Sequence, residues 1–248
     1  MFKLLTIITL SSIISTKGMA NEFKPLSYKN DEIDIIEINN ESGSIEGETT
    51  KDLINIKTDE KYDPDKCETT LKVKDKKLTI SIESKEKDRL NKDSKCETGI
   101  KISSPSDKKL LLTNGSGSIK VKDFISGGDF EEGAGVIEFE NVSGEIKTKI
   151  GAGNIKGITS SDNVSIMSGS GKIDLKWNKI LDKGMISIKI GSGNTLLSFP
   201  KETKMNISFI SGIGRLHSEF VNHDSSDLKI YHISGSGNLK IKKLDKLN

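Results

Sequence analysis

The segment with the most obvious chemical potential is Gly169-Ser170-Gly171-Lys172, which resembles part of a phosphate-binding loop. That motif requires a glycine five residues before its second glycine and a serine or threonine after its lysine. The sequence has Ile166 and Ile173 at these two positions. Similar glycine phrases recur elsewhere in the chain without the lysine, so we interpret this segment as a structural turn.

The three histidines, His217, His223 and His232, could be metal ligands, and Asp224 and Asp227 lie near the second of them in sequence. A metal site needs three or four converging ligands with set geometry. His232 falls at a position expected to face the interior, where a buried, hydrogen-bonded histidine is the simpler explanation. The sequence therefore indicates no metal and no cofactor, but it leaves open whether any of the three histidines binds a metal.

The carboxylates of the sequence indicate neither a calcium site nor a catalytic pair. Calcium-binding solenoids repeat a glycine- and aspartate-rich nonapeptide, and only Gly127-Gly128-Asp129 comes close to it. Enzymes that cleave polysaccharides use paired acids, but Glu138 and Asp174 alternate along the repeats with Lys120 and Lys156. We therefore predict no catalytic residues and no enzyme. The alternative is a carbohydrate-active enzyme built on the same repeats.

The feature that organises the chain is the phrase Gly-x-Gly-x-apolar, which recurs from the middle of the sequence to its end. The first four copies are 18 residues apart, and the later steps are 22, 21 and 23 residues. A fixed period of this length indicates stacked repeats. The copies begin at Gly115, Gly133, Gly151, Gly169, Gly191, Gly212 and Gly235.

Apolar residues keep the same places around each phrase, on alternating positions before and after the glycines. Alternation of this kind is typical of strands with one buried face. We therefore predict an all-β fold, a single-stranded β-helix or β-solenoid with about 18–23 residues per coil. In it the glycine phrase is the turn between two strands, and successive coils pair in parallel. The position two residues after the second glycine shows the pattern best: Ile119, Ile137, Ile155, Ile173, Thr195, Leu216 and Leu239.

Outward positions carry charge. Lys120, Glu138, Lys156 and Asp174 alternate in sign at 18-residue steps, which predicts a neutral ladder of opposite charges on a solvated face. The chain ends in the lysine-rich segment 240–246. Lysines on a last strand would discourage pairing with other chains, so we expect this strand to oppose end-to-end assembly.

The N-terminal part is less regular. Residues 21–109 are predicted to hold a first, degenerate coil around Ser42-Gly43-Ser44-Ile45, followed by a β-hairpin insertion with its turn at 74–77 and a charged loop at 83–95. The two cysteines, Cys67 and Cys96, are predicted to form a disulfide across that loop. Residues 110–248 form the regular repeats, and we expect 21–248 to be one continuous domain.

Residues 1–20 have the pattern of a signal peptide, with Lys3, an apolar stretch and the small-x-small site Gly18-Met19-Ala20. Their removal takes away Lys3 and Lys17 and leaves 36 basic and 36 acidic residues. A net charge of zero in the mature chain argues against a nucleic-acid partner. The sequence predicts export to the periplasm, the cell surface or the medium, and no membrane span in the mature chain.

The repeated Gly-Ser-Gly-x-Ile phrases, the exported N-terminus and the segments Ser104–Leu110 and Phe199–Met205, with proline followed by lysine, resemble the bacterial family of exported β-strand-repeat proteins called putative adhesins. The resemblance covers roughly residues 33–243 and brings no catalytic residues with it. It implies a β-helix-like fold at the bacterial envelope, and the family name suggests adhesion. We therefore expect an adhesin-like structural or interaction protein whose partner is another envelope protein, a surface glycan or a host molecule. A self-assembling envelope scaffold is a further alternative, and the oligomeric state is open.

Overall fold

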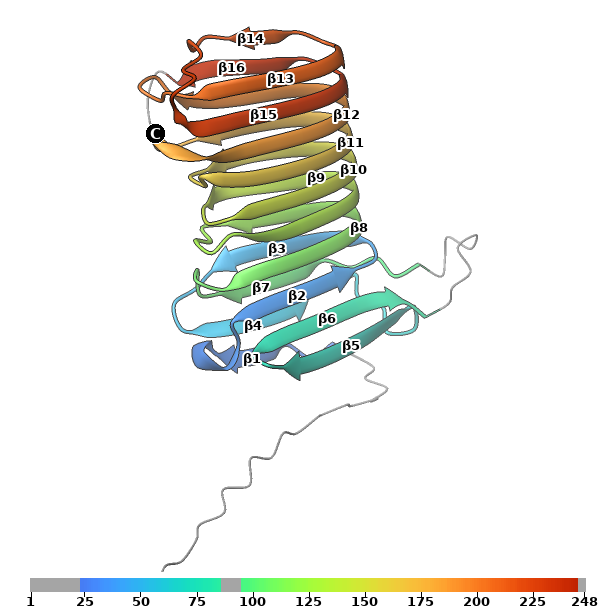
Figure 1. The fold of residues 1–248 in the computed structure, drawn as a ribbon. Coiled ribbons are helices and arrows are strands. Elements are labelled where there is room, and N and C mark those ends of the chain that lie inside the picture. The colour runs from blue at the N-terminus through green and yellow to red at the C-terminus, as the bar shows by residue number, and fades with distance from the viewer. Residues whose placement is uncertain (1–22, 86–94, 245–248) are drawn as a thin grey trace, which may run out of the picture.

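A computed structural model describes residues 23–85 and 95–244. The predicted signal peptide and residues 86–94 of the predicted charged loop lie outside the described residues. The chain forms an all-β solenoid in which all sixteen described strands belong to one sheet (Figure 1). The β-solenoid fold predicted from the glycine period is therefore confirmed.

The regular coils are five long strands stacked in parallel. Each coil passes through its glycine phrase as a bend inside one continuous strand, not as a turn between two separate strands, because the ladder hydrogen bonds continue on both sides of the glycines. The strands are β8 (Lys109–Lys122), β9 (Gly128–Val142), β10 (Ile146–Thr159), β11 (Asn163–Trp177) and β12 (Lys183–Pro200).

The register places like residues above like residues, as the period predicts. Ile155 lies beside Ile173, and Gly153 beside Gly171, at the strand spacing of about 4.8 Å. The inward isoleucines are almost completely buried, and their stacking gives each coil a core that it could not form alone. One position departs from the pattern: Gly157, which the pattern places in the core, has a φ of +142° beside an irregularity in the ladder.

The N-terminal end contains the predicted first coil, hairpin and disulfide. Gly43 pairs with Gly117, so the degenerate phrase at 42–45 does belong to a coil. The hairpin turns at Asp75 and Lys76, and Cys67 and Cys96 form the disulfide. The elements are β1 (Leu26–Lys29), the 3₁₀ turn η1 (Asn30–Glu32), β2 (Ile35–Asn40), β3 (Gly43–Thr49), β4 (Leu53–Thr58), β5 (Cys67–Lys74), β6 (Lys77–Ser84) and β7 (Ile100–Ser104).

The C-terminal end corrects the expected order of coils. Its strands are β13 (Asn206–Ile213), β14 (Leu216–Ser218), β15 (Asp227–Ser236) and β16 (Leu239–Leu244). The final coil, β15–β16, lies between β12 and the preceding coil, β13–β14 (Figure 1). Strand β12 ends at Pro200, which has no amide hydrogen for a ladder. After β12 the chain leaves the adjacent coil position empty and forms β13 and β14 one position further along. Strands β15 and β16 then return and occupy the position next to β12.

This order overturns the prediction that the lysine-rich last strand protects an open end. Strand β16 pairs with β12 on one side and with β14 on the other, so it is internal. The strands that form the open end are β13 and β14, which carry no lysine. The argument against end-to-end assembly therefore falls.

Candidate functional site

The bend at each glycine phrase depends on backbone that only glycine adopts easily. Gly171 has a φ of +137°, in the region that favours glycine. A side chain there would also collide with the carbonyl oxygen of Gly153 in the coil below. Because every regular coil bends at the same place, the bends align along the solenoid axis.

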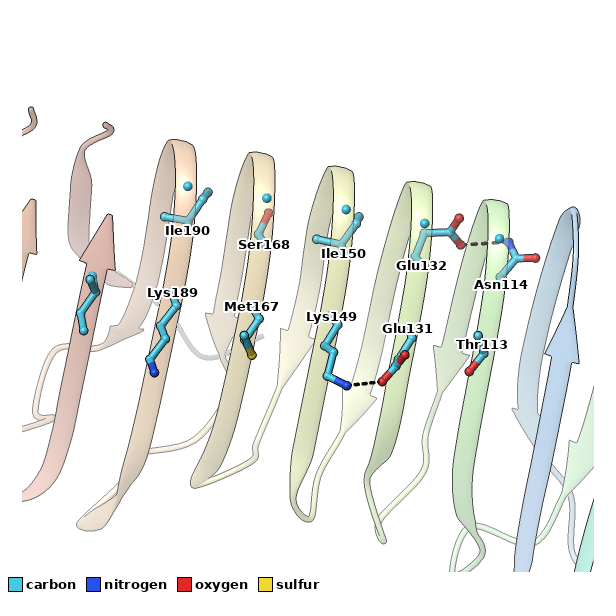
Figure 2. Close-up of a pocket in the computed structure, with 16 residues that line it drawn as sticks. Thr113, Asn114, Glu131, Glu132, Lys149, Ile150, Met167, Ser168, Lys189 and Ile190 are labelled. Carbon is cyan, nitrogen blue, oxygen red and sulfur yellow. Dashed lines mark hydrogen bonds and ion pairs between the residues drawn. The ribbon is translucent and has the colours of Figure 1, made fainter. Parts of the chain in front are cut away.

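A shallow open groove of about 760 Å³ follows this line of bends across five coils, and Ile233 of β15, beside Lys189 in register, lines its end in the next coil. Each of the five coils contributes the two residues before its first glycine and that glycine itself (Figure 2). The first glycine of each phrase is exposed, so the groove contains a strip of backbone without side chains. These glycines are Gly115, Gly133, Gly151, Gly169 and Gly191.

The outer row of side chains forms one rim of the groove. Glu131 and Lys149, from neighbouring coils, form an ion pair at 2.6 Å between Oε1 and Nζ. Met167 comes next and is 52% exposed, and Lys189 follows it (Figure 2). Glu131 and Lys149 offset each other, so Lys189 leaves this rim with one net positive charge.

The inner row lies on the other side of the strand backbone and points into the solenoid. It is polar at one end, at Asn114 and Glu132, and mixed toward the other end, at Ile150, Ser168 and Ile190 (Figure 2). All five side chains are buried. The surface of the groove that a ligand could touch is therefore made mainly by the glycines and the outer row.

Three inward polar side chains form a hydrogen-bonded chain beneath one end of the groove. The Nδ2 of Asn40 donates to Oδ1 of Asn114 at 3.1 Å, and the Nδ2 of Asn114 donates to Oε2 of Glu132 at 2.9 Å. Burial raises the pKa of the Glu132 carboxyl to about 7, although the bond from Asn114 and backbone hydrogen bonds favour the charged form. Its other oxygen, Oε1, is buried without a hydrogen-bond partner among the described residues.

The raised pKa of Glu132 predicts a pH-dependent stability. The folded state holds a proton that the unfolded chain loses near pH 4.5, so the stabilisation is present at low pH and is lost as the pH rises through 7. We expect the free energy of unfolding to fall by about 2 kcal/mol from this group between pH 5 and pH 8. Urea denaturation of Glu132→Gln should show a smaller dependence, and exposed Glu131→Gln is the control. If the free energy of unfolding changed equally with pH in Glu132→Gln and in the wild type, the raised pKa of Glu132 would be contradicted.

The histidines considered from the sequence do not meet. His232 is fully buried, its Nε2 lies 3.0 Å from Oγ1 of Thr195, and burial lowers its pKa to about 4. His217 lies on β14 and His223 in the segment before β15, and both are exposed. In the described part of the chain, no three histidine, cysteine, aspartate or glutamate side chains are grouped as metal ligands.

The residues of the predicted charge ladder lie beside one another in register, but only some of them form ion pairs. Glu138 lies between Lys120 and Lys156, and the pair with Lys156 measures 3.3 Å. For the other neighbours on this ladder, no ion pair within 4.0 Å occurs among the described residues. Exposed pairs of this kind contribute about 0–1 kcal/mol each.

Sequence reasoning missed Asn114 and Glu132, the two polar members of the inner row that hydrogen-bond to each other. The signal was available, because the inward alternation through Leu110 and Leu112 continues to Asn114 without a break. In the next coil the same alternation runs through Phe130 to Glu132. A polar residue at an inward position of a repeat indicates a hydrogen-bonded interior group.

The described residues contain no helix of the length and apolarity that a membrane crossing requires. No protein-family model matches the chain, and no curated protein matches it either.

Solved structures show a distant likeness over most of the chain. A putative cell adhesion protein from Clostridium sporogenes is 14% identical, with a TM-score of 0.42, over 89% of this chain and 100% of that one. A putative adhesin from Bacteroides fragilis is 15% identical, with a TM-score of 0.34, over 89% and 96%. One from Parabacteroides merdae is 12% identical, with a TM-score of 0.30, over 90% and 97%. The structures from Bacteroides fragilis and Parabacteroides merdae are called putative adhesins, the name of the family that the glycine phrases resemble.

Proposed function

We propose that this chain is an exported, adhesin-like binding protein that holds an extended, uncharged polysaccharide in the groove along its glycine bends. The observation that carries the proposal is the groove itself, which crosses five coils without interruption. A ligand lying along the solenoid axis would meet an equivalent set of groups at every coil, about 4.8 Å apart. Many weak, repeated contacts of this kind suit a polymer better than a compact small molecule.

The surface chemistry of the groove supports a sugar polymer. The exposed glycines present a flat strip of Cα–H groups, against which the apolar face of a sugar ring can lie. Thr113, Lys149 and Lys189 offer hydrogen-bonding groups at the rim, where the ring hydroxyls would be. The ion pair between Glu131 and Lys149 leaves Lys189 as the one positive charge among the described rim residues without an acid beside it, which is too little charge to favour a polyanion over an uncharged polymer.

The placement of the acids supports binding without cleavage. Glycoside hydrolysis requires two carboxyl groups on either side of the same glycosidic bond. In this groove, Glu131 is paired with Lys149, and Glu132 is buried beneath the surface and accepts from Asn114. Neither arrangement leaves a pair of free carboxyl groups facing a ligand.

Export forms part of the same proposal. The signal-peptide pattern of residues 1–20 motivates it, and the disulfide between Cys67 and Cys96 supports it, since disulfides persist in oxidising compartments. An exported protein with a long ligand groove suits a role at the bacterial envelope.

The test is a pair of matched methionine substitutions. Met167→Glu places a charge in the groove, and Met185→Glu places the same charge at an equally exposed methionine outside it; the two residues are 52% and 50% exposed. Malto-, cello- and chito-oligosaccharides are the probes, and binding is measured by calorimetry. We expect the wild type and Met185→Glu to bind one series alike, and Met167→Glu to bind it at least about tenfold more weakly.

Two outcomes would contradict the proposal. The first is that the wild type binds none of the three oligosaccharide series. The other is equal weakening by both substitutions, which would place the ligand outside the groove. Release of reducing sugars by the wild type would instead support the enzymatic alternative.

A further inference from the structure

The C-terminal end of the solenoid is an open end with two unpaired strand edges. Strand β13 pairs only with β15, and β14 pairs only with β16, so each has one neighbour in the described part of the chain. The two strands lie on opposite walls of the last coil (Figure 1). An exposed strand edge presents free amide and carbonyl groups and is a ready template for pairing.

The core is also uncovered at this end. Ile207 and Phe209 occupy the inward positions that Ile230 and His232 hold one coil below, where both are 0% exposed, yet they are only half-buried. Leu216 is 42% exposed, whereas Leu239, its neighbour in register, is fully buried. The stack therefore ends on apolar side chains that a further coil would cover.

The shape of this end restricts what can cover it. A single peptide strand would satisfy either β13 or β14, and it would leave the core between them open. A second copy of the same end has two edges and a core with the same spacing. It would cover β13, β14 and the apolar side chains between them at once.

The absence of charged side chains on β13 and β14 is compatible with contact between two identical C-terminal ends. Strand β13 has the sequence Asn-Ile-Ser-Phe-Ile-Ser-Gly-Ile, and β14 is Leu-His-Ser. Neither strand carries an acid, a lysine or an arginine, so the two strand pairs would form without like charges opposed.

The N-terminal end does not fit against this surface. Its outer strands, β1 and β5, are held antiparallel to their neighbours, and β5 exposes Lys72 and Lys74. The two ends therefore differ in strand direction and in charge. Contact between two C-terminal ends is favoured over head-to-tail stacking.

We propose that two copies join through their C-terminal ends as a closed twofold dimer. A twofold axis perpendicular to the solenoid and passing through both walls would place β13 antiparallel to β13 of the partner and β14 antiparallel to its counterpart. Such an interface uses the same surface on both copies and closes on itself. The dimer would be a double-length rod with two glycine grooves and an N-terminal cap at each end.

The test compares two leucines of equal exposure at opposite ends. Leu216 is 42% exposed on β14, and Leu53 is 44% exposed on β4. We expect sedimentation equilibrium to give twice the monomer mass for the wild type and for Leu53→Glu. For Leu216→Glu we expect a dimer dissociation constant at least about tenfold higher.

A charge swap makes the test specific for the twofold contact. Leu216→Lys alone should also weaken the dimer, whereas a mixture with Leu216→Glu should recover it as a heterodimer. Circular dichroism tests whether each variant is folded. If a variant at Leu216 does not fold, His217→Glu takes its place. A monomeric wild type, a dimer weakened by Leu53→Glu and not by Leu216→Glu, or no recovery on mixing would overturn the proposal.

Discussion

Replacing Gly171 by alanine is expected to destabilise the protein by about 4 kcal/mol or more, an effect at the upper end for a single substitution. Two causes add together. A φ of +137° is strained for any residue with a side chain, at about 1–3 kcal/mol. The new methyl group would also meet the carbonyl oxygen of Gly153, which is held in place by the parallel ladder between the two coils.

Gly47→Ala is the matched control, because this glycine lies in an inward position where the coils allow a side chain. Its register partner in the next coil is Val121. A methyl group at Gly47 would lie 3.4 Å from the Phe124 ring, an ordinary contact. We expect little change or a gain of up to about 1 kcal/mol from reduced freedom of the unfolded chain. Urea denaturation measures both variants, and equal losses would contradict the stacking account.

Removing the disulfide is expected to cost about 3–4 kcal/mol, because the bridge closes a loop with a sequence separation of 29 residues in the unfolded chain. Both cysteines are buried, at 2% and 0% exposure, so the double variant Cys67→Ala, Cys96→Ala also leaves a small cavity. The bridge ties the start of β5 to the segment before β7. Its loss therefore frees the cap at the N-terminal end of the stack.

The measurement compares the double variant with wild-type protein reduced by dithiothreitol, which keeps both sulfur atoms and lacks the bond between them. Both should lose stability in urea, and the double variant should lose slightly more because of its cavity. An unfolding midpoint that reduction leaves unchanged would show that the cap is held by packing alone.

The sequence predicted the regular coils because each residue there repeats the environment of its equivalent one period away. Ile119, Ile137, Ile155 and Ile173 share one neighbourhood, so four copies of one pattern support one structure. The hairpin at Asp75 and Lys76 was predictable for a different reason. It depends only on local alternation and a short polar turn.

The order of the last coils depends on contacts between distant segments, which periodicity does not encode. One sequence signal does indicate the true neighbours. The phrase Gly191-Ser192-Gly193-Asn194 is repeated as Gly235-Ser236-Gly237-Asn238, and the two asparagines hydrogen-bond at 3.1 Å. The intervening phrase, Gly212-Ile213-Gly214-Arg215, diverges from both. It belongs to the terminal coil, where Ile213 is 78% exposed.

The groove could not be predicted from the sequence for a related reason. Its exposed strip consists of glycines, which carry no chemical signal, and its rim side chains are ordinary surface residues. Only the alignment of successive bends makes Glu131, Lys149 and Met167 neighbours, although they are 18 residues apart in sequence. The functional proposal therefore depends on register more than on any motif.

The most direct test of that proposal is calorimetric titration of the wild type with oligosaccharides of increasing length from one series. If the ligand lies along the five coils of the groove, its affinity should rise with each added sugar until the groove is filled and then level off. Met167→Glu should remove this dependence, whereas Met185→Glu should preserve it. An affinity independent of chain length, or the same dependence in both variants, would contradict a ligand that lies along the glycine bends.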